Sequence, residues 1–416
     1  MILAASIPPE SGTGASRYIG ILLLIAVSLL AAELLRRKHA LPSFLRVLTY
    51  TYSEFVLLGL AIGPLGLGLL DRRLLREFDP LLHLSLGAIG LLYGLQFRFA
   101  HIRRFLPAMF GVTFFQAAFT FLLCYMTLFV LALLLGAHPI DAAFLAATLG
   151  TIASVSAPQP IAHTIREQQV RGENAHLLQF ITALDGLFGV CALALVMAAR
   201  TDYAVVAVAW LDVAAAVVVA ILVGLICGVA FHWLTEGPTS PQERVLYMLG
   251  LVTFGSGVAA TLHLSPLFVN VVFGLTVANL SYRVEETSRQ LGRLERPLFI
   301  VLLILAGARW ELSGRWLGPL MAGYLLCRLL GKWAGAWLGV RVFPLYFQPV
   351  GRLGLALMGQ GGIALALLVS LSLVERGPLM GVIETVVILS IVVSELVTPP
   401  LVRHVLTHGR EARGER

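Results

Sequence analysis

One acidic residue stands alone in a stretch of the chain that is apolar enough to cross a membrane. Asp185 lies in QFITALDGLFGVCALALVM, where its neighbours are apolar or small. A charged side chain at the centre of a bilayer costs at least roughly 2.5 to 3.5 kcal/mol, so it is kept there for a reason. A carboxylate in that position can bind and release a proton, and its oxygens can bind a small cation. We therefore expect Asp185 to be a proton- and cation-binding residue.

Three basic residues also fall within predicted membrane spans. Arg309 lies in LFIVLLILAGARWEL, and Arg328 and Lys332 lie four residues apart in CRLLGKW. Residues four apart share one face of a helix, and like charges on one face require an acidic or backbone partner. We expect one of the three to balance the charge of Asp185. The alternative is a structural ion pair that locks Asp185 to one of them, which can coexist with transport.

Two segments that must position these charges are interrupted helices. The first is TIASVSAPQPIAHTIR, residues 151–166, and the second is GRLGLALMGQGGIALA, residues 351–366. Open backbone is tolerated in a membrane only where it is buried in protein or lines a wet cavity. The alternative for the first segment is a simple proline kink. The expected breaks are Pro158, Pro160, Gly359, Gly361 and Gly362, and the candidate cation ligands beside them are Thr151, Ser154, Ser156 and Gln360.

The composition places the whole chain in a membrane. Of its 416 residues, 58% are hydrophobic and 13% are charged, and the mean hydropathy is +0.88. One water-soluble core cannot bury so much apolar surface. Thirteen spans, each near the roughly 20 residues that a spanning helix needs, are expected at residues 18–36, 47–70, 80–98, 105–135, 141–164, 176–199, 203–234, 244–262, 265–281, 297–312, 316–343, 350–374 and 379–404.

Paired interrupted helices, one in each half of a chain, are typical of secondary transporters built from inverted repeats. The sequence therefore predicts an all-α polytopic membrane protein with inverted repeats and two crossed discontinuous helices, spans 5 and 12. The four cysteines lack the spacing of a metal site or a disulfide framework, and the chain contains no Ser-His-Asp order or HExxH run. We expect no cofactor, no metal beyond the transported cation, no nucleic-acid partner and no enzymatic activity.

The basic residues predict the orientation of the chain. If the N-terminus is outside, twenty of the thirty Lys and Arg residues lie in cytoplasmic loops or the tail, seven lie on the opposite side and three lie within spans. Cytoplasmic loops of membrane proteins carry such an excess. We therefore expect an integral membrane protein, of the bacterial inner membrane, with its N-terminus outside and its C-terminus in the cytoplasm. No soluble regulatory domain is expected.

Several motifs in this order resemble the monovalent cation:proton antiporter superfamily, in particular its thirteen-span, sodium/proton exchanger-like branch. They are GLAIGPLGLGLLD (residues 59–71), GLLYGLQFRFAHIRR (90–104), TALDGLFGV (182–190), LCRLLGKWAGAWLG (326–339), GQGGIALAL (359–367) and SELVTPPLVR (394–403). The resemblance implies a homodimer with a core domain and a dimerisation domain. It places core-type spans within 80–199 and 297–374 and scaffold spans within 18–70, 203–281 and 379–404, in one membrane transport domain, residues 1–416.

The resemblance also implies where this chain departs from its relatives. Asp185 corresponds to the first residue of the family's paired acidic motif, and Gly186 replaces the second. Ala157 stands where an acidic residue is common, and Gln96 stands where the third span commonly has a glutamate. One carboxylate in place of two predicts exchange of one proton per cation, which is electroneutral.

The predicted function is secondary antiport by alternating access, with protons exchanged for Na⁺ or K⁺. Two alternatives stay open. The loss of the second acidic residue is also compatible with a non-transporting sensor or partner subunit on the same scaffold. The basic residues and helix N-termini could instead hold a carboxylate in a sodium-coupled organic anion symporter.

Overall fold

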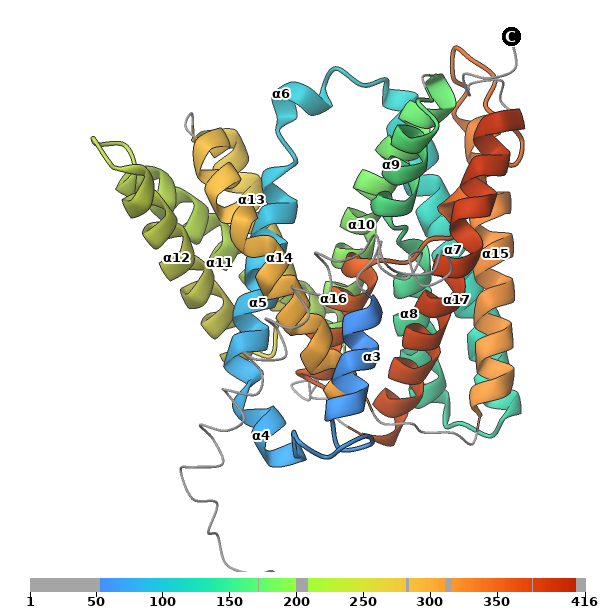
Figure 1. The fold of residues 1–416 in the computed structure, drawn as a ribbon, viewed down its shortest axis with the longest axis horizontal. Helices are drawn as coiled ribbons and strands as arrows, with labels where there is room; N and C mark the ends of the chain where they lie inside the picture. The colour runs from blue at the N-terminus through green and yellow to red at the C-terminus, as the bar shows by residue number, and fades with distance from the viewer. Residues whose placement is uncertain are drawn as a thin grey trace, which may run out of the picture.

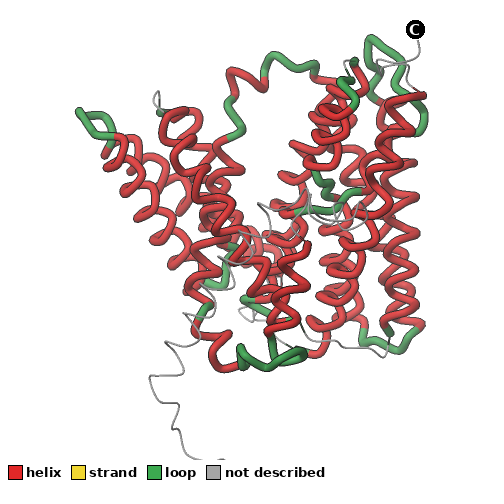
Figure 2. Tube along the Cα trace, in the orientation of Figure 1, coloured by secondary structure: helices red, strands yellow, loops and turns green. Residues whose placement is uncertain are grey.

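The computed structural model describes residues 53–170, 172–199, 209–281, 284–310, 316–375 and 377–408. In this part of the chain the regular secondary structure is helical, and loops and turns connect the helices (Figure 2). The first expected span, 18–36, lies outside these residues. The elements in chain order are α3 (Ser53–Ile62), α4 (Arg72–Glu77), α5 (Asp79–Leu95), α6 (Phe99–Ile102), α7 (Pro107–Leu134), α8 (Pro139–Ser154), α9 (Pro158–Glu167), α10 (Glu173–Ala199), α11 (Ala209–Leu234), α12 (Pro241–Thr261), α13 (Pro266–Leu280), α14 (Val284–Arg309), α15 (Leu317–Val342), the 3₁₀ helix η2 (Leu353–Met358), α16 (Gly362–Ser372) and α17 (Pro378–His408).

Six helical segments in the described residues are long and apolar enough to cross a membrane: Pro107–Leu134, Pro139–Glu167, Glu173–Ala199, Leu211–Leu234, Pro241–Thr261 and Pro378–Thr407. Shorter apolar helices are Asp79–Leu95, Pro266–Leu280, Pro297–Arg309 and Gly362–Ser372. The chain is therefore an integral membrane protein by length and composition of its helices. The count of thirteen spans stays a prediction.

Proline marks the start of many of these helices. Pro107, Pro139, Pro158, Pro241 and Pro266 all lie in the first turn of a helix. The first backbone N–H groups of a helix have no partner within it, so the missing donor of proline costs nothing there, and its fixed φ suits the helix. Proline therefore favours the start of each of these helices.

The helices pack as two groups that lie side by side (Figure 1). The α13 group consists of α3, α4, α5, α11, α12, α13 and α14. The α10 group consists of α7, α8, α9, α10, α15, η2, α16 and α17. The short helix α6 lies on the connection between them, at the end of the molecule where the chain's C-terminus lies.

Close glycine contacts join the helices within each group. In the α13 group, a Cβ atom on Gly94 would lie 2.2 Å from the carbonyl oxygen of Val271, and one on Gly274 would lie 2.2 Å from that of Leu91. In the α10 group, Gly331 and Gly335 of α15 face α7 in the same way. Small residues let helix backbones approach closely where lipid supplies no hydrophobic drive between helices.

The core and scaffold ranges expected from the sequence stay predictions, and the observed contacts between helices cut across them. The range 80–199 contains α5, which packs on α13, and the range 297–374 contains α14, which packs on α3 and α5. The range 379–404 falls in α17, which packs on η2, α9 and α15. The order of helices along the chain does not determine which of them pack together. For α5 and α13, the close contacts at Gly94 and Gly274 bring the two helices together.

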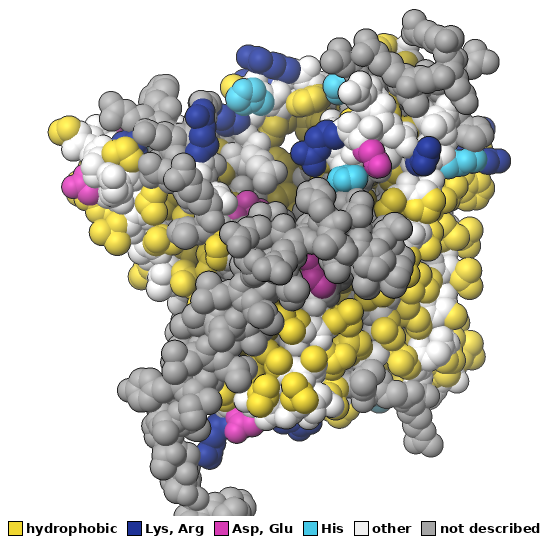
Figure 3. Space-filling model, in the orientation of Figure 1, with side chains coloured by type: hydrophobic (Ala, Val, Ile, Leu, Met, Phe, Trp, Pro, Cys, Tyr) yellow, Lys and Arg dark blue, Asp and Glu magenta, His cyan; other side chains and the backbone are white. Residues whose placement is uncertain are grey.

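The helices are buried to different degrees, even within one group. In the apolar window of each segment, 78% of Pro139–Glu167 is buried, against 28% of Pro107–Leu134 and 22% of Leu211–Leu234. The interrupted segment is therefore enclosed by protein, while α7 and α11 carry large exposed apolar side chains. Figure 3 shows apolar side chains covering much of the visible surface between the two ends of the molecule. Backbone that is open in the membrane needs this enclosure.

Candidate functional site

The two interruptions meet inside the α10 group. Helix α8 ends at Ser154 and α9 begins at Pro158, and η2 ends at Met358 before α16 begins at Gly362. The N–H of Ala157 donates a hydrogen bond of 2.8 Å to the carbonyl of Gly359. Segments two hundred residues apart in the chain thus satisfy each other's open backbone.

The expected break residues each have a local reason. Pro158 is in the first turn of α9, where its missing backbone N–H has no partner to lose, and Pro160 is buried two residues further on. A Cβ atom on Gly361 would lie 2.8 Å from the Cβ of Ala157, and one on Gly362 would lie 2.2 Å from the ring of Phe299. A larger side chain at Gly361 would push the second interruption away from the first, and one at Gly362 would push it away from α14.

Asp185 lies where the interruptions meet. Its side chain is fully buried. One carboxylate oxygen, Oδ2, accepts a hydrogen bond of 2.6 Å from the hydroxyl of Ser156, and Oδ1 accepts one of 3.2 Å from the Ser156 backbone N–H. The backbone N–H is available because Ser156 lies between α8 and α9 and has no partner within a helix.

Lys332 is the basic residue that contacts Asp185. Its Nζ lies 3.1 Å from Oδ2 of Asp185, and both side chains are completely buried. The ammonium also donates to the carbonyl of Ser154 at 2.5 Å and to the hydroxyl of Ser156 at 2.8 Å. All three protons of the ammonium are used, as a buried charge requires.

Arg328 connects the two interruptions through their backbones. Its guanidinium donates to the carbonyls of Ala153 and Val155 at the end of α8 and to those of Met358 and Gly359 after η2, the last two at 3.0 Å. Carbonyls at helix C-termini carry partial negative charge and lack partners. One cation thus stabilises two helix ends, and it lies one helical turn from Lys332.

The remaining candidate ligands differ in their freedom to bind a cation. The Thr151 hydroxyl is buried and has no hydrogen-bond partner among the described residues. The Ser154 hydroxyl donates to the Thr151 carbonyl at 2.7 Å. The Gln360 side chain donates to the Tyr324 hydroxyl at 2.6 Å and accepts from Ser390 at 2.7 Å. Gln360 is therefore held by α15 and α17.

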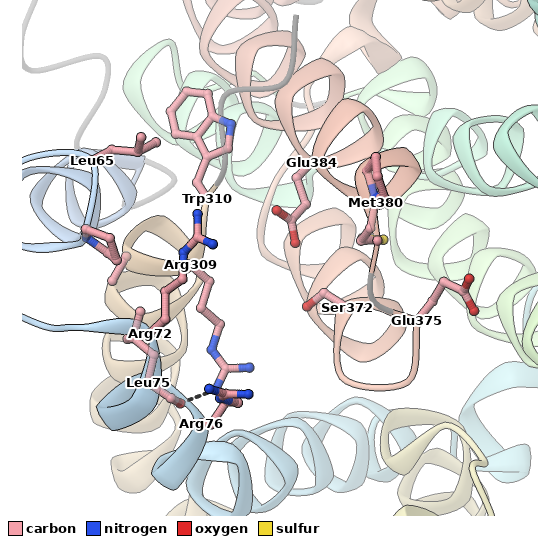
Figure 4. A pocket seen from close by; sticks show the side chains of 15 residues that line it. Leu65, Arg72, Leu75, Arg76, Arg309, Trp310, Ser372, Glu375, Met380 and Glu384 are labelled. Carbon is pink, nitrogen blue, oxygen red and sulfur yellow. Dashed lines mark hydrogen bonds between the residues drawn. The ribbon is translucent and has the colours of Figure 1, made fainter. Parts of the chain in front are cut away.

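Arg309 lies elsewhere, which corrects the expectation that it could balance Asp185. Its guanidinium donates to the carboxylate of Asp79 and to the carbonyl of Leu75. Figure 4 shows it lining a pocket of about 680 Å³ with Arg72, Arg76, Trp310 and Glu384 among its neighbours. Neither Asp185 nor Lys332 lines this pocket.

Sequence reasoning missed three residues that complete these arrangements. Tyr324 lies four residues before Arg328, so helical spacing alone puts it on the face that carries Arg328 and Lys332. Asp79 precedes a proline at the start of a helix, a common place for an acid, but nothing in the sequence pairs it with Arg309. Ser390 carries no signal in a span rich in apolar residues.

The model of the transmembrane sodium/hydrogen exchanger family matches residues 22–404. The chain is a sodium/hydrogen exchanger family member. As a member of that family it belongs to a class of transporters, and its relatives exchange sodium ions for protons.

Solved structures give this exchanger family member the same fold. The sodium proton antiporter MjNhaP1 of Methanocaldococcus jannaschii at pH 8 matches with a TM-score of 0.70 and 16% identity, covering 94% of this chain and 99% of that chain. A second structure of the same antiporter, from electron microscopy, matches with a TM-score of 0.67 and 14% identity, over 98% of this chain and 100% of the other. No curated protein matches this chain in sequence.

Proposed function

We propose that this family member exchanges protons for Na⁺ at Asp185, with K⁺ as a second cation to be tested. The observation that carries the proposal is the placement of one fully buried carboxylate at the meeting point of two helix interruptions, in contact with Lys332 and Ser156. A buried carboxylate with a hydroxyl and open backbone carbonyls around it offers the oxygen ligands that an alkali cation prefers.

The proposed exchange is a competition for the oxygens of Asp185. In the empty site the charge of the carboxylate is balanced by the ammonium of Lys332, 3.1 Å away. A proton binds to the carboxylate directly. A sodium ion would bind the carboxylate with the hydroxyls of Ser156 and Thr151 and the carbonyl of Ser154, displacing Lys332 from these oxygens. Because proton and cation use the same oxygens, they cannot bind together.

Electroneutral exchange follows if Lys332 keeps its proton throughout. The site then holds no net charge when empty and one positive charge when either H⁺ or Na⁺ is bound, so equal charges cross in each direction. If Lys332 gave up its proton when Na⁺ bound, two protons would leave for each cation. The number of titrating groups at the site thus sets the stoichiometry.

The proposed movement is a displacement of the α10 group against the α13 group. Asp185, Lys332, Arg328 and both interruptions belong to the α10 group, so they would move as one unit. The homodimer implied by the family resemblance is part of this proposal. Its candidate surface is the α13 group, where α11 and α12 carry large exposed apolar side chains, among them Leu222, Ile226, Val229, Leu246 and Phe254.

The orientation with the C-terminus in the cytoplasm is also proposed. Figure 3 shows Lys and Arg side chains gathered mainly at the end of the molecule that carries the C-terminus. This asymmetry is what the excess of basic residues on the cytoplasmic side of membrane proteins produces.

The test is Na⁺-driven proton movement in proteoliposomes, followed with a pH-sensitive dye. We expect Asp185→Asn to abolish the Na⁺-dependent signal, because an amide keeps the shape but cannot be ionised. The control is Asp212→Asn in α11, an acid in the other helix group, which should retain exchange. Exchange that survives in Asp185→Asn would refute the assignment, and wild-type protein without any exchange would favour the non-transporting alternative.

A further inference from the structure

Tyr93 reaches across the boundary between the two helix groups to the helix that carries Asp185. It belongs to α5 in the α13 group, and its ring is 7% exposed. Its hydroxyl donates a hydrogen bond of 2.7 Å to the carbonyl of Ala183 in α10. Ala183 lies two residues before Asp185 in the same helix.

Gly186 makes this contact possible. A Cβ atom at position 186 would lie 2.6 Å from the Tyr93 hydroxyl oxygen and 3.1 Å from Cδ1 of Ile363. Real Cβ atoms do not approach so closely, so any other residue at 186 would displace the tyrosine. The position that lacks a second acidic side chain is thus filled by a hydroxyl from the opposite helix group.

Two other hydrogen bonds cross the same boundary, further from Asp185 along the chain. The hydroxyls of Ser265, before α13, and Ser370, in α16, lie 2.9 Å apart. The indole N–H of Trp310, after α14, donates to the hydroxyl of Thr385 in α17 at 3.0 Å. These buried bonds must break if the groups move apart, but neither involves α10.

We propose that Tyr93 is a positioning residue for cation exchange. Its hydrogen bond to Ala183, which the absence of a side chain at Gly186 permits, holds α10 against α5 in one access state. This bond must break before the α10 group moves, so it lowers the rate of that movement. This inference rests on the proposed antiport, because only an alternating-access protein needs this bond to form and break.

The first test is Tyr93→Phe, which removes one hydroxyl and keeps the ring. The bond's net contribution corresponds to roughly a 2- to 13-fold change in the equilibrium between bonded and separated states. We expect amide hydrogen exchange in α5 and in α10 around Ala183 to rise by that factor, with exchange in α7 and α15 unchanged. Tyr125→Phe is the matched control, since Tyr125 lies on α7, within the α10 group.

The turnover rate separates the proposed role from a general loosening of the helix packing, because loosened packing alone would not increase the rate of exchange. If the bond must break before the α10 group moves, Tyr93→Phe should increase the rate of Na⁺-driven proton exchange at saturating Na⁺, while Tyr125→Phe should leave it at the wild-type value. A turnover that is unchanged or reduced in Tyr93→Phe, or hydrogen exchange equal to that of Tyr125→Phe, would overturn the proposal.

A second variant tests the match between Tyr93 and Gly186. Gly186→Ala should lose thermal stability and exchange activity because its methyl group meets the tyrosine hydroxyl, and Tyr93→Phe in the same chain should restore part of both. Equal losses from Gly186→Ala in both backgrounds would contradict the proposed pairing. Hydrogen exchange does not depend on transport, so it still decides whether the Tyr93 bond holds α10 against α5. A wild-type chain without cation exchange would refute the proposed antiport, and with it the role of Tyr93 in exchange.

Discussion

At the scale of single residues, the site is an ion pair in which neither partner can be removed alone without leaving a buried charge. Asp185 and Lys332 are both fully buried and 3.1 Å apart. Breaking such a pair by removing one partner typically destabilises a protein by roughly 3 to 5 kcal/mol, whereas removing both is far milder.

We therefore expect Lys332→Gln to lower thermal stability strongly and Lys332→Gln with Asp185→Asn to recover much of it. The measurement is thermal unfolding of the purified protein in detergent, at one pH and without Na⁺. Losses that simply add in the double variant would show that the two side chains do not interact.

Sodium should also distinguish these variants. A ligand that binds only the folded state stabilises it by RT ln(1 + [L]/Kd), so the stability rises with the logarithm of the ligand concentration once that concentration exceeds the dissociation constant. We expect Na⁺ to raise the unfolding temperature of the wild-type protein, with no such rise for Asp185→Asn. A rise of equal size in Asp185→Asn would place the cation elsewhere.

The charged residues of the candidate site could be singled out from the sequence for a physical reason, and the roles expected for them stay predictions. An acid within an apolar span and two cations one helical turn apart are costly features that stand out in any single segment. What lies across from them is decided by tertiary packing, so Asp79 as the partner of Arg309, and Tyr324 and Ser390 as the partners of Gln360, could not be found from spacing along the chain.

At the scale of elements, close backbone contacts hold α5 against α13. A Cβ atom on Gly274 would lie 2.2 Å from the carbonyl oxygen of Leu91. The nearest atom belongs to the backbone of α5, which cannot change its position by adopting another rotamer as a side chain can. The two helices would have to separate to accept a methyl group.

We expect Gly274→Ala to destabilise the protein by roughly 1 to 3 kcal/mol, the usual cost of overpacking. Gly250→Ala in α12 is the control, because a Cβ atom there meets nothing within 4 Å. The measurement is thermal unfolding of both variants beside the wild-type protein. Equal stability of the two variants would mean that α5 and α13 do not pack as described.

The division into core and scaffold spans stays a prediction, and the contacts between helices cut across the ranges expected for it. The ranges expected for the core placed α5 and α14 with α7 to α10, yet both pack in the α13 group, while α17 packs in the α10 group. Hydropathy identifies a span but gives every span the same apolar character. Which helix packs beside which depends on small residues that lie opposite each other on the two helices. The sequence of one helix alone does not show this match.

At the scale of the whole molecule, the proposed stoichiometry has an electrical consequence. Moving one net charge across a membrane potential of 100 mV changes the free energy by about 2.3 kcal/mol. Exchange of one H⁺ for one Na⁺ moves no net charge. We expect the rate of Na⁺-driven proton exchange to be the same with the potential clamped at zero and at about −100 mV, set by K⁺ and valinomycin.

A strong acceleration or inhibition by the potential would rule out one-for-one exchange. It would indicate that Lys332 also releases a proton during the cycle, and Lys332→Gln should then lose the voltage dependence. The experiment should use Na⁺ as the driving cation, because K⁺ sets the potential.

The hydroxyl of Ser156 has a single hydrogen, which it gives to Asp185 while it accepts another from Lys332. When the carboxyl group carries its own proton, the hydroxyl needs only to rotate about its C–O bond to receive that proton. Side-chain rotations take picoseconds to nanoseconds, and displacements of packed helices take microseconds to milliseconds. The change of hydrogen bonding that protonation of Asp185 requires is therefore much faster than a displacement of the helices, and it should not limit the transport rate.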